Sequence, residues 1–387
     1  MIEHRVTNTA KLGAIAAFWV AVGLVQTFNW EGGVLKAIVL FALLLSVPFV
    51  MAAARRDIAP MSPAWQRGVT IAAIVWFVLD LIFLAIRIRN PHILDIGTTT
   101  LDAGNAVLSG GNPYTLPIDT GPQSVGFTGY KYLPLMFATY LPLGLWLDQR
   151  GLLLTNLVLL LGCVWFMRRL TKSDLAPLLL LMLPIVPEQI FAKGATDLVA
   201  VLPLLAGLFF FGRSAFLTGL CVGLSIAAKL LPGVMFLPCL LPSQDRAKYL
   251  AGVVVGLMPT VPFLIASPRA FLDNTVFFAM AKLPDTTAWL SSVPSMVADL
   301  AHLVLLGGFI WAAAHVWRRA PSLAARCGIG TMLVLGAILA GPGAHHNYQL
   351  WWMPFYAVIL SLALTGDETC QRGAGRDTNP ASIPFKS

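Results

Sequence analysis

The sequence predicts an all-α, polytopic membrane protein with about twelve transmembrane helices, and its composition is the first reason. Hydrophobic residues make up 57% of the chain, charged residues make up 11%, and the mean hydropathy is +0.77. In a soluble domain about a quarter of the residues are charged. The apolar runs repeatedly reach the ~20 residues that cross a bilayer core as a helix, and few alternate like the strands of a membrane barrel. Spanning helices are therefore the expected class.

The apolar runs also give the order of the spans and the side of each loop. They predict spans at residues 10–28, 33–53, 69–88, 151–168, 175–190, 197–212, 214–229, 231–241, 248–267, 294–317, 324–341 and 348–365. The first run is kept as an uncleaved helix, because no clear small-residue cleavage site precedes the second. Short loops rich in Lys and Arg face the cytoplasm. Basic pairs that mark this side stand at positions 55/56, 168/169, 246/248 and 318/319.

Two segments leave alternatives open. Residues 132–147 are apolar but short and contain two prolines, so they lie along the interface, re-enter, or cross and thereby invert every later side. Residues 214–241 could form one long helix, but Lys229 and Pro232 interrupt the run. We expect a split there, because two spans keep the later basic pairs on the cytoplasmic side.

The chain is expected to form one membrane domain over residues 1–366, with 88–131 as a long first outer loop and 367–387 as a polar, disordered cytoplasmic tail. The net charge of +8 does not indicate nucleic-acid binding, because no basic patch is interleaved with aromatic residues. The five cysteines form neither a disulfide framework nor a metal-binding CxxC. No internal repeat of obvious period is present.

The outer loop carries two acids, Asp95 and Asp102, seven residues apart. A continuous helix would place both on one face, about 10 Å apart along its axis. Gly97 and the three threonines that follow it disfavour a helix. We therefore expect an extended segment that carries Asp95 and then a short helix over residues 101–108, ended by a glycine pair.

Asp95 is the best candidate for a general base, because it follows a predicted span by a few residues and lies near the outer headgroup plane. A solvated loop acid is the alternative. Asp102 is expected to lie on a helix face and not to act as a second catalytic residue. The predicted topology puts nearly all unusual polar residues on the outer side: Asp95, Asp102, Asn112, Tyr130, Glu188, Lys193, Asp197, Lys229, His345 and His346.

Lys229 is an isolated charge between apolar residues, which in a membrane segment indicates function by default. A phosphate group is its natural partner, and a side chain that snorkels to the interface is the alternative.

The stretch GPGAHHNYQLWWMPF, residues 341–355, holds two adjacent histidines followed by aromatic residues. Adjacent side chains point in different directions on a helix, so at most one of His345 and His346 faces a site there. Tyr348, Trp351 and Trp352 suit an interfacial belt. Metal ligation is not expected, because no third and fourth ligand has recognisable spacing.

Five motifs between residues 80 and 360 resemble a known family when they are taken in order. They are Asp95 with DAGNAVLSGGNPY, GYKYLPL at 129–135, KGATD at 193–197, AAKLLP at 227–232 and AHHNYQLWWMP. In this order they resemble the polyprenol-phosphate-mannose-dependent mannosyltransferases of the GT-C superfamily, glycosyltransferase family 87. Leu133 stands where that family's Tyr-Pro-Pro-Leu segment has its first proline, and Ala195 stands where a glutamine is usual.

The resemblance implies a GT-C fold, a lipid-linked sugar donor, catalysis outside the cytoplasmic leaflet and Asp95 as the base. The expected reaction is inverting transfer of a sugar, mannose in the first instance, from a polyprenyl monophosphate to an outer-leaflet glycolipid or glycan in the plasma membrane. His346 is expected to assist catalysis. Residues expected to bind substrate are Lys229, His345, Asp102, Asn112, Tyr130 and Asp197. No cofactor, metal or nucleic acid is expected, and membrane lipids are the remaining partners.

Two other classes compete with this prediction. A transporter or lipid flippase would use the breaks at residues 229–232 and 184–187 as discontinuous helices around a midplane site. The missing repeat and the gathering of polar residues on one side speak against it. A membrane acyl- or phosphotransferase would use His345 or His346, but no nucleophile motif accompanies them.

Overall fold

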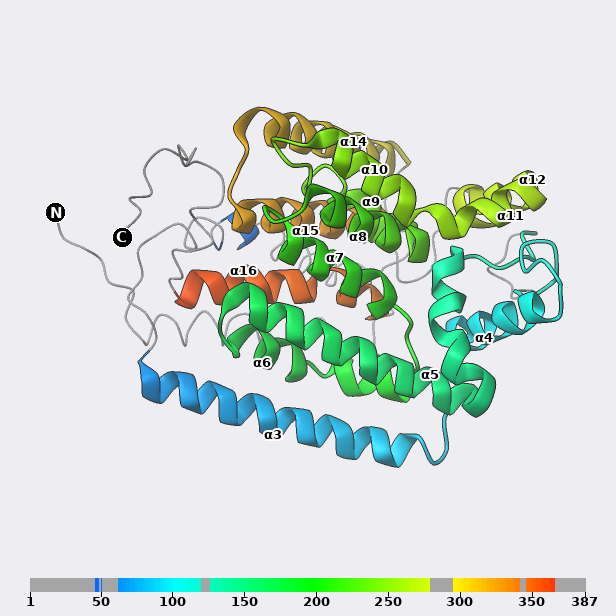
Figure 1. Ribbon diagram of the computed structural model, residues 1–387, viewed down its shortest axis with the longest axis horizontal. Helices are drawn as coiled ribbons and strands as arrows, with labels where there is room; N and C mark the ends of the chain where they lie inside the picture. Colours follow the sequence, from blue (N-terminus) through cyan, green and yellow to red (C-terminus); the bar gives the residue numbers. More distant parts are fainter. Residues whose placement is uncertain are drawn as a thin grey trace, which may run out of the picture.

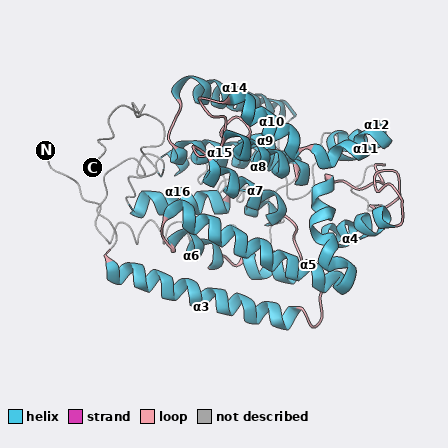
Figure 2. Cartoon of the chain, in the orientation of Figure 1, coloured by secondary structure: helices cyan, strands magenta, loops and turns pink. Residues whose placement is uncertain are grey.

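The computed structural model describes residues 46–48, 50, 62–119, 126–278, 295–341 and 346–365. Every regular element in these ranges is helical (Figure 2), which confirms the all-α prediction. The elements are α3 Pro63–Arg87, α4 Asp95–Leu108, α5 Pro134–Thr171, α6 Leu175–Leu181, η2 Val186–Ala192, α7 Leu198–Phe210, α8 Ala215–Ala228, α9 Leu230–Phe236, α10 Arg246–Gly256, η3 Met258–Thr260, α11 Val261–Ala266, α12 Pro268–Leu272, η4 Asp273–Phe277, α14 Ser295–Arg319, α15 Leu323–Ala340, η6 His346–Trp351 and α16 Met353–Thr365.

Five helices in the described ranges are long and apolar enough to cross a membrane, or six if the bent pair α6 and η2 forms one span. The predicted count of twelve is therefore not confirmed. The predicted spans at 10–28 and most of 33–53 lie outside the described residues. Several others are short: α7 and α8 have 13 and 14 residues, or about 20 Å each, against a hydrocarbon core of about 30 Å.

Figure 1 shows α4, α11 and α12 together at one end of the helical bundle. We call this the loop end, defined by α4, residues 109–133 and residues 258–278. The other end holds basic side chains from the predicted cytoplasmic pairs and is called the arginine end. There Arg168 pairs with Asp174 at 2.8 Å, and the guanidinium of Arg246 lies 3.5 Å from the ring centroid of Trp317. The chain is polarised along the bundle, as its sequence predicts.

The segment for which three arrangements were open, residues 132–147, turns back on itself. α5 is interrupted at Asp148, whose φ of 50° and ψ of −127° are not helical. The Tyr140 hydroxyl donates to Asn156 Oδ1 at 2.6 Å across this interruption, which a straight helix would not allow. A Cβ on Gly151 would lie 2.1 Å from the Leu143 carbonyl oxygen. The first part of α5 therefore folds against the second part, which provides the length of the span.

The predicted helix break at Lys229 is confirmed. α8 ends at Ala228, and Lys229 is extended, with φ of −137° and ψ of 125°. A Cβ on Gly233 would lie 2.6 Å from the Ile226 nitrogen, so α9 folds back closely on α8. Pro232 lies in the first turn of α9, where its missing N–H leaves no intrahelical bond unmade. Lys229 consequently occupies the tip of a tight helical hairpin.

The predicted extended segment around Asp95 is wrong, because α4 runs without interruption from Asp95 to Leu108. The threonine hydroxyls are the physical reason. Thr98 donates to the Asp95 carbonyl at 2.9 Å, and Thr100 donates to the Ile96 carbonyl at 2.6 Å. Such bonds to the preceding turn satisfy β-branched threonine inside a helix. The predicted stop is confirmed, since Gly110 follows the helix with a φ of +78°.

Candidate functional site

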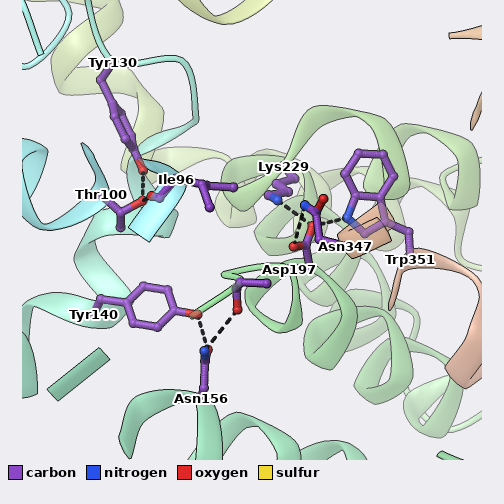
Figure 3. A network of polar contacts seen from close by, with 10 residues as sticks. Ile96, Thr100, Tyr130, Tyr140, Asn156, Asp197, Lys229, Asn347 and Trp351 are labelled. Carbon is purple, nitrogen blue, oxygen red and sulfur yellow. Dashed lines mark hydrogen bonds and ion pairs between the residues drawn. The ribbon is translucent and has the colours of Figure 1, made fainter. Parts of the chain in front are cut away.

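A buried carboxylate, Asp197, joins three separate elements at the loop end (Figure 3). Its Oδ1 atom accepts from the Lys229 ammonium and from the Trp351 indole N–H. Its Oδ2 atom accepts from the Asn347 amide at 3.0 Å. Asp197 lies directly before α7, Lys229 lies in the α8–α9 break, and Asn347 and Trp351 belong to η6. These four residues are called the Asp197 cluster. The sequence prediction included Asp197 and Lys229 but neither η6 partner.

Lys229 is buried and does not snorkel to the surface, since its side chain is 4% exposed. Its nitrogen lies 5.2 Å from the ring centroid of Tyr132 and 5.5 Å from that of Trp351. Aromatic faces attract a cation at such distances. The carboxylate and two rings together compensate a charge that would be costly to bury alone. The result is a fixed cation at the tip of a helix hairpin.

Asp95 is tied to the chain segment that ends in Asp197. The backbone N–H of Leu94, directly before α4, donates to the Lys193 carbonyl at 2.8 Å. A Cβ on Gly97 would lie 3.4 Å from the Gly194 carbonyl oxygen, so the first turn of α4 packs against this segment. Asp95 itself is exposed, and its Oδ1 atom accepts from the Ile96 N–H at 2.7 Å. The candidate base thus stands on the surface beside the Asp197 segment.

A buried asparagine holds the Asp197 segment in place. The Asn156 amide donates to the carbonyls of Ile190 and Ala195, each at 3.0 Å, and its oxygen accepts from Tyr140. Sequence reasoning missed Asn156, although a polar residue in the apolar run 151–168 was a usable signal. Its two bonds to these carbonyls fix the loop that brings Asp197 to Lys229, and the bond from Tyr140 orients its amide (Figure 3).

Several predicted site residues lie away from the Asp197 cluster. Tyr130 is 0% exposed and shares a hydrogen bond of 3.1 Å with the Thr100 hydroxyl. Asn112 forms a turn, in which its Oδ1 atom accepts from the Tyr114 N–H at 3.0 Å. Asp102 is exposed on α4. In this conformation Tyr130 and Asn112 hold the loop together.

The histidine pair falls outside the part of the chain that can be described: His345 entirely, and His346 in its side chain. The aromatic residues that follow differ from the prediction. Trp351 and Trp352 are buried, at 6% and 0% exposed, and do not form an interfacial belt. For Trp351 the reason is its indole N–H, which donates to Asp197 inside the bundle. Tyr348 stacks on Trp351 with ring centroids 4.2 Å apart.

Tyr132 is a site residue that the sequence prediction did not include. Its ring faces the Lys229 ammonium. Burial raises the pKa of the Tyr132 phenol well above its usual value, and the nearby charges of Asp197 and Asp95 raise it further. Both carboxylates therefore act on this one side chain, although they belong to different elements. Within the described residues, no group of three or more His, Cys, Asp or Glu side chains could hold a metal ion.

Comparison with known proteins gives two findings. The family model for glycosyltransferase family 87 matches residues 130–344, a range that includes Tyr132, Asp197 and Lys229 but not Asp95 or Asn347. The fold is similar to the crystal structure of ArnT from Cupriavidus metallidurans bound to undecaprenyl phosphate, with a TM-score of 0.51 and 16% sequence identity. The similarity covers 75% of this chain and 59% of the ArnT chain. No curated protein matches the sequence.

Proposed function

The chain belongs to glycosyltransferase family 87, and from this premise we propose that it transfers a sugar from a polyprenyl monophosphate to a glycolipid or glycan at the outer face of the plasma membrane. Mannose is the sugar that we propose. The observation that carries the proposal is the Lys229 cation, which pairs with Asp197 and faces Tyr132. The Asp95 segment is bonded to the chain that leads into Asp197. The undecaprenyl phosphate bound to ArnT supports a donor of the same class.

Lys229 is proposed to hold the donor phosphate. A lysine ammonium has three N–H donors, and Asp197 accepts from one of them. The remaining donors can meet phosphate oxygens, while the carboxylate holds the ammonium in place. One of His345 and His346 is proposed to approach the same phosphate. Asp102, Asn112 and Tyr130 are proposed to shape the acceptor side through α4 and its loop.

Asp95 is proposed as the general base of a single displacement. The acceptor hydroxyl gives its proton to the Asp95 carboxylate as its oxygen attacks the anomeric carbon. The bond from that carbon to the phosphate oxygen breaks, and its electron pair leaves with the phosphate. The products are an inverted glycoside and polyprenyl phosphate. Positioned proton transfer contributes roughly 10²–10⁴-fold to such a rate, and Lys229 offsets the charge of the leaving group.

The proposed topology places the loop end outside the cytoplasm. The arginine end would then face inward, as the positive-inside rule requires for short basic loops. A polyprenyl-phosphate donor needs no nucleotide site, which agrees with the absence of a Gly-rich phosphate loop from the sequence.

The test compares two acids on the same helix, Asp95→Asn and Asp102→Asn. Both substitutions keep the size of the side chain and remove its charge. With labelled polyprenyl-phosphate sugar and acceptor saturating, Asp95→Asn should lose roughly 10²–10⁴-fold in turnover, whereas Asp102→Asn should lose much less. Donor binding should survive in both variants.

Near-normal turnover by Asp95→Asn would remove the proposed base, and inactivity of Asp102→Asn alone would move that role to the second acid. The same assay separates the enzyme from a carrier. Movement of labelled lipid across the membrane without glycoside formation by the wild type would favour the transporter alternative.

A further inference from the structure

Tyr132 is held rigidly between the outer loop and the Asp197 cluster. Its carbonyl accepts from the Tyr114 hydroxyl at 2.9 Å, and the next residue, Leu133, is the extended N-cap of α5. Its ring centroid lies 5.6 Å from that of Tyr130 and 5.2 Å from the Lys229 nitrogen. The backbone and the ring are therefore both fixed, and the hydroxyl direction is fixed with them.

The Tyr132 hydroxyl differs from those of five other tyrosines in the described residues. Within the described part of the chain, it makes no hydrogen bond. Hydroxyls that do have a partner belong to Tyr114, Tyr130, Tyr140, Tyr249 and Tyr356. A hydroxyl without a protein partner can form its hydrogen bond with water or with a ligand. Tyr132 is half-buried, beside a cation suited to phosphate, so a ligand oxygen is the partner that this position fits.

The charges around Tyr132 determine what its hydroxyl can do. Burial, Asp197 and Asp95 all raise the pKa of the phenol, so it stays protonated at physiological pH. A protonated phenol donates a hydrogen bond and does not act as a base. Lys229 lies against the ring face, so a phosphate held by Lys229 would lie within the neighbourhood of the hydroxyl.

We propose that Tyr132 is a further catalytic residue, whose hydroxyl donates a hydrogen bond to the oxygen that leaves with the donor phosphate. This inference rests on the proposed function. As the glycosidic bond breaks, its electron pair passes to that oxygen, and the hydrogen bond strengthens as negative charge builds. The phenol keeps its proton, so no further acid, base or co-reactant takes part.

The test is Tyr132→Phe, which removes the hydroxyl and keeps the ring that Lys229 and Tyr130 contact. Hydrogen bonds to charged groups contribute roughly 1.5–3 kcal/mol, which corresponds to about a 10- to 100-fold lower kcat. The KM for the donor should change little, because the charge develops after binding. Inhibition by the product, polyprenyl phosphate, should weaken by a similar factor, because the product carries the developed charge.

Tyr249→Phe is the matched control. Tyr249 is also buried and donates to the Leu237 carbonyl at 2.7 Å, on the α10 helix. Loss of this hydroxyl should lower the thermal unfolding midpoint and leave kcat and product inhibition unchanged. Unchanged kcat and product inhibition in Tyr132→Phe would overturn the inference, as would a loss shared equally by kcat, donor KM and thermal stability. If the wild type neither uses polyprenyl-phosphate sugars nor binds polyprenyl phosphate, the proposed function itself fails.

Discussion

Two lysines, Lys229 and Lys131, are both buried near Tyr132 but are compensated in different ways. Lys229, at the helix break, forms an ion pair with the buried carboxylate of Asp197. Lys131, in the segment before α5, donates to two neutral oxygens: the Gly129 carbonyl at 3.0 Å and Asn274 Oδ1 at 3.4 Å. Its nitrogen also lies 4.9 Å from the Phe278 ring centroid. No carboxylate in the described residues forms an ion pair with Lys131 within 4.0 Å.

The difference indicates what each lysine is suited to. The full negative charge of Asp197 compensates the Lys229 ammonium and holds it in one position, which suits the binding of an anionic substrate. Neutral oxygens compensate Lys131 less completely, and burial lowers the pKa of its ammonium to about 8, partly offset by the charge of Asp119. Lys131 and Gly129 both contact Asn274 in η4. Lys131 therefore fastens the outer loop to η4, whereas Lys229 is the lysine that we propose binds the donor phosphate.

Breaking the Lys229–Asp197 pair from either side should give the largest effect. Asp197→Asn leaves a buried ammonium without its counter-charge, and Lys229→Met leaves a buried carboxylate. Removing one partner of a buried pair costs roughly 3–5 kcal/mol. Each single variant should therefore unfold at a clearly lower temperature in detergent, measured by circular dichroism.

The double variant Asp197→Asn/Lys229→Met separates charge from packing. It should recover most of the lost stability, because neither charge is left alone, even though the Trp351 and Asn347 bonds are weakened. Single variants as stable as the wild type would show that the pair carries no stability. A double variant that loses the sum of both single effects would contradict an ion pair as the cause.

A smaller effect is expected on the affinity for polyprenyl phosphate. It can be measured in the double variant, which should be more stable than either single variant. Without Lys229, the phosphate loses a charged donor that contributes roughly 1.5–3 kcal/mol. The Kd for polyprenyl phosphate should rise about 10- to 100-fold in a binding titration with labelled lipid. Lys131→Met, matched in chemistry, should bind like the wild type. Equal affinities in the double variant and the wild type would leave Lys229 with a structural role only.

The sequence predicted the features that depend on single runs of residues. Hydropathy gave the all-α membrane class, and the isolated charge before Pro232 gave the helix break at Lys229. Asp197 and Lys229 were both predicted as site residues. Their contact joins positions 32 apart, and the bond from Trp351 to Asp197 joins positions 154 apart. Periodicity within one run holds no information about such pairings, so Trp351 was assigned to an interfacial belt.

Tyr130 and Tyr132 show the same limit at shorter range. They stand two residues apart in GYKYLPL and are equivalent by composition and spacing. Their roles separate only because α4 continues through Thr100, whose hydroxyl meets that of Tyr130. Helix propensity alone favoured an extended segment there. Because the helix was not predicted, the contact between Thr100 and Tyr130 that distinguishes the two tyrosines was not predicted either. Tertiary contacts therefore decided both the helix and the site residue.

The smallest expected effect concerns the pH dependence of stability that Lys131 should cause. The folded-state pKa of about 8 lies below the ~10.4 of an unfolded lysine. Between these values the unfolded chain binds a proton that the folded chain lacks, so stability rises with pH. The cost of burying the charge is fully present below about pH 8 and is gone above about pH 10.4.

The thermal unfolding midpoint of the wild type should therefore rise by a few degrees, relative to that of Lys131→Met, between these two pH limits. Lys248→Met changes an exposed lysine that pairs with Asp245. Its unfolding midpoint should change with pH in the same way as that of the wild type. Parallel curves for Lys131→Met as well would contradict the lowered pKa of Lys131.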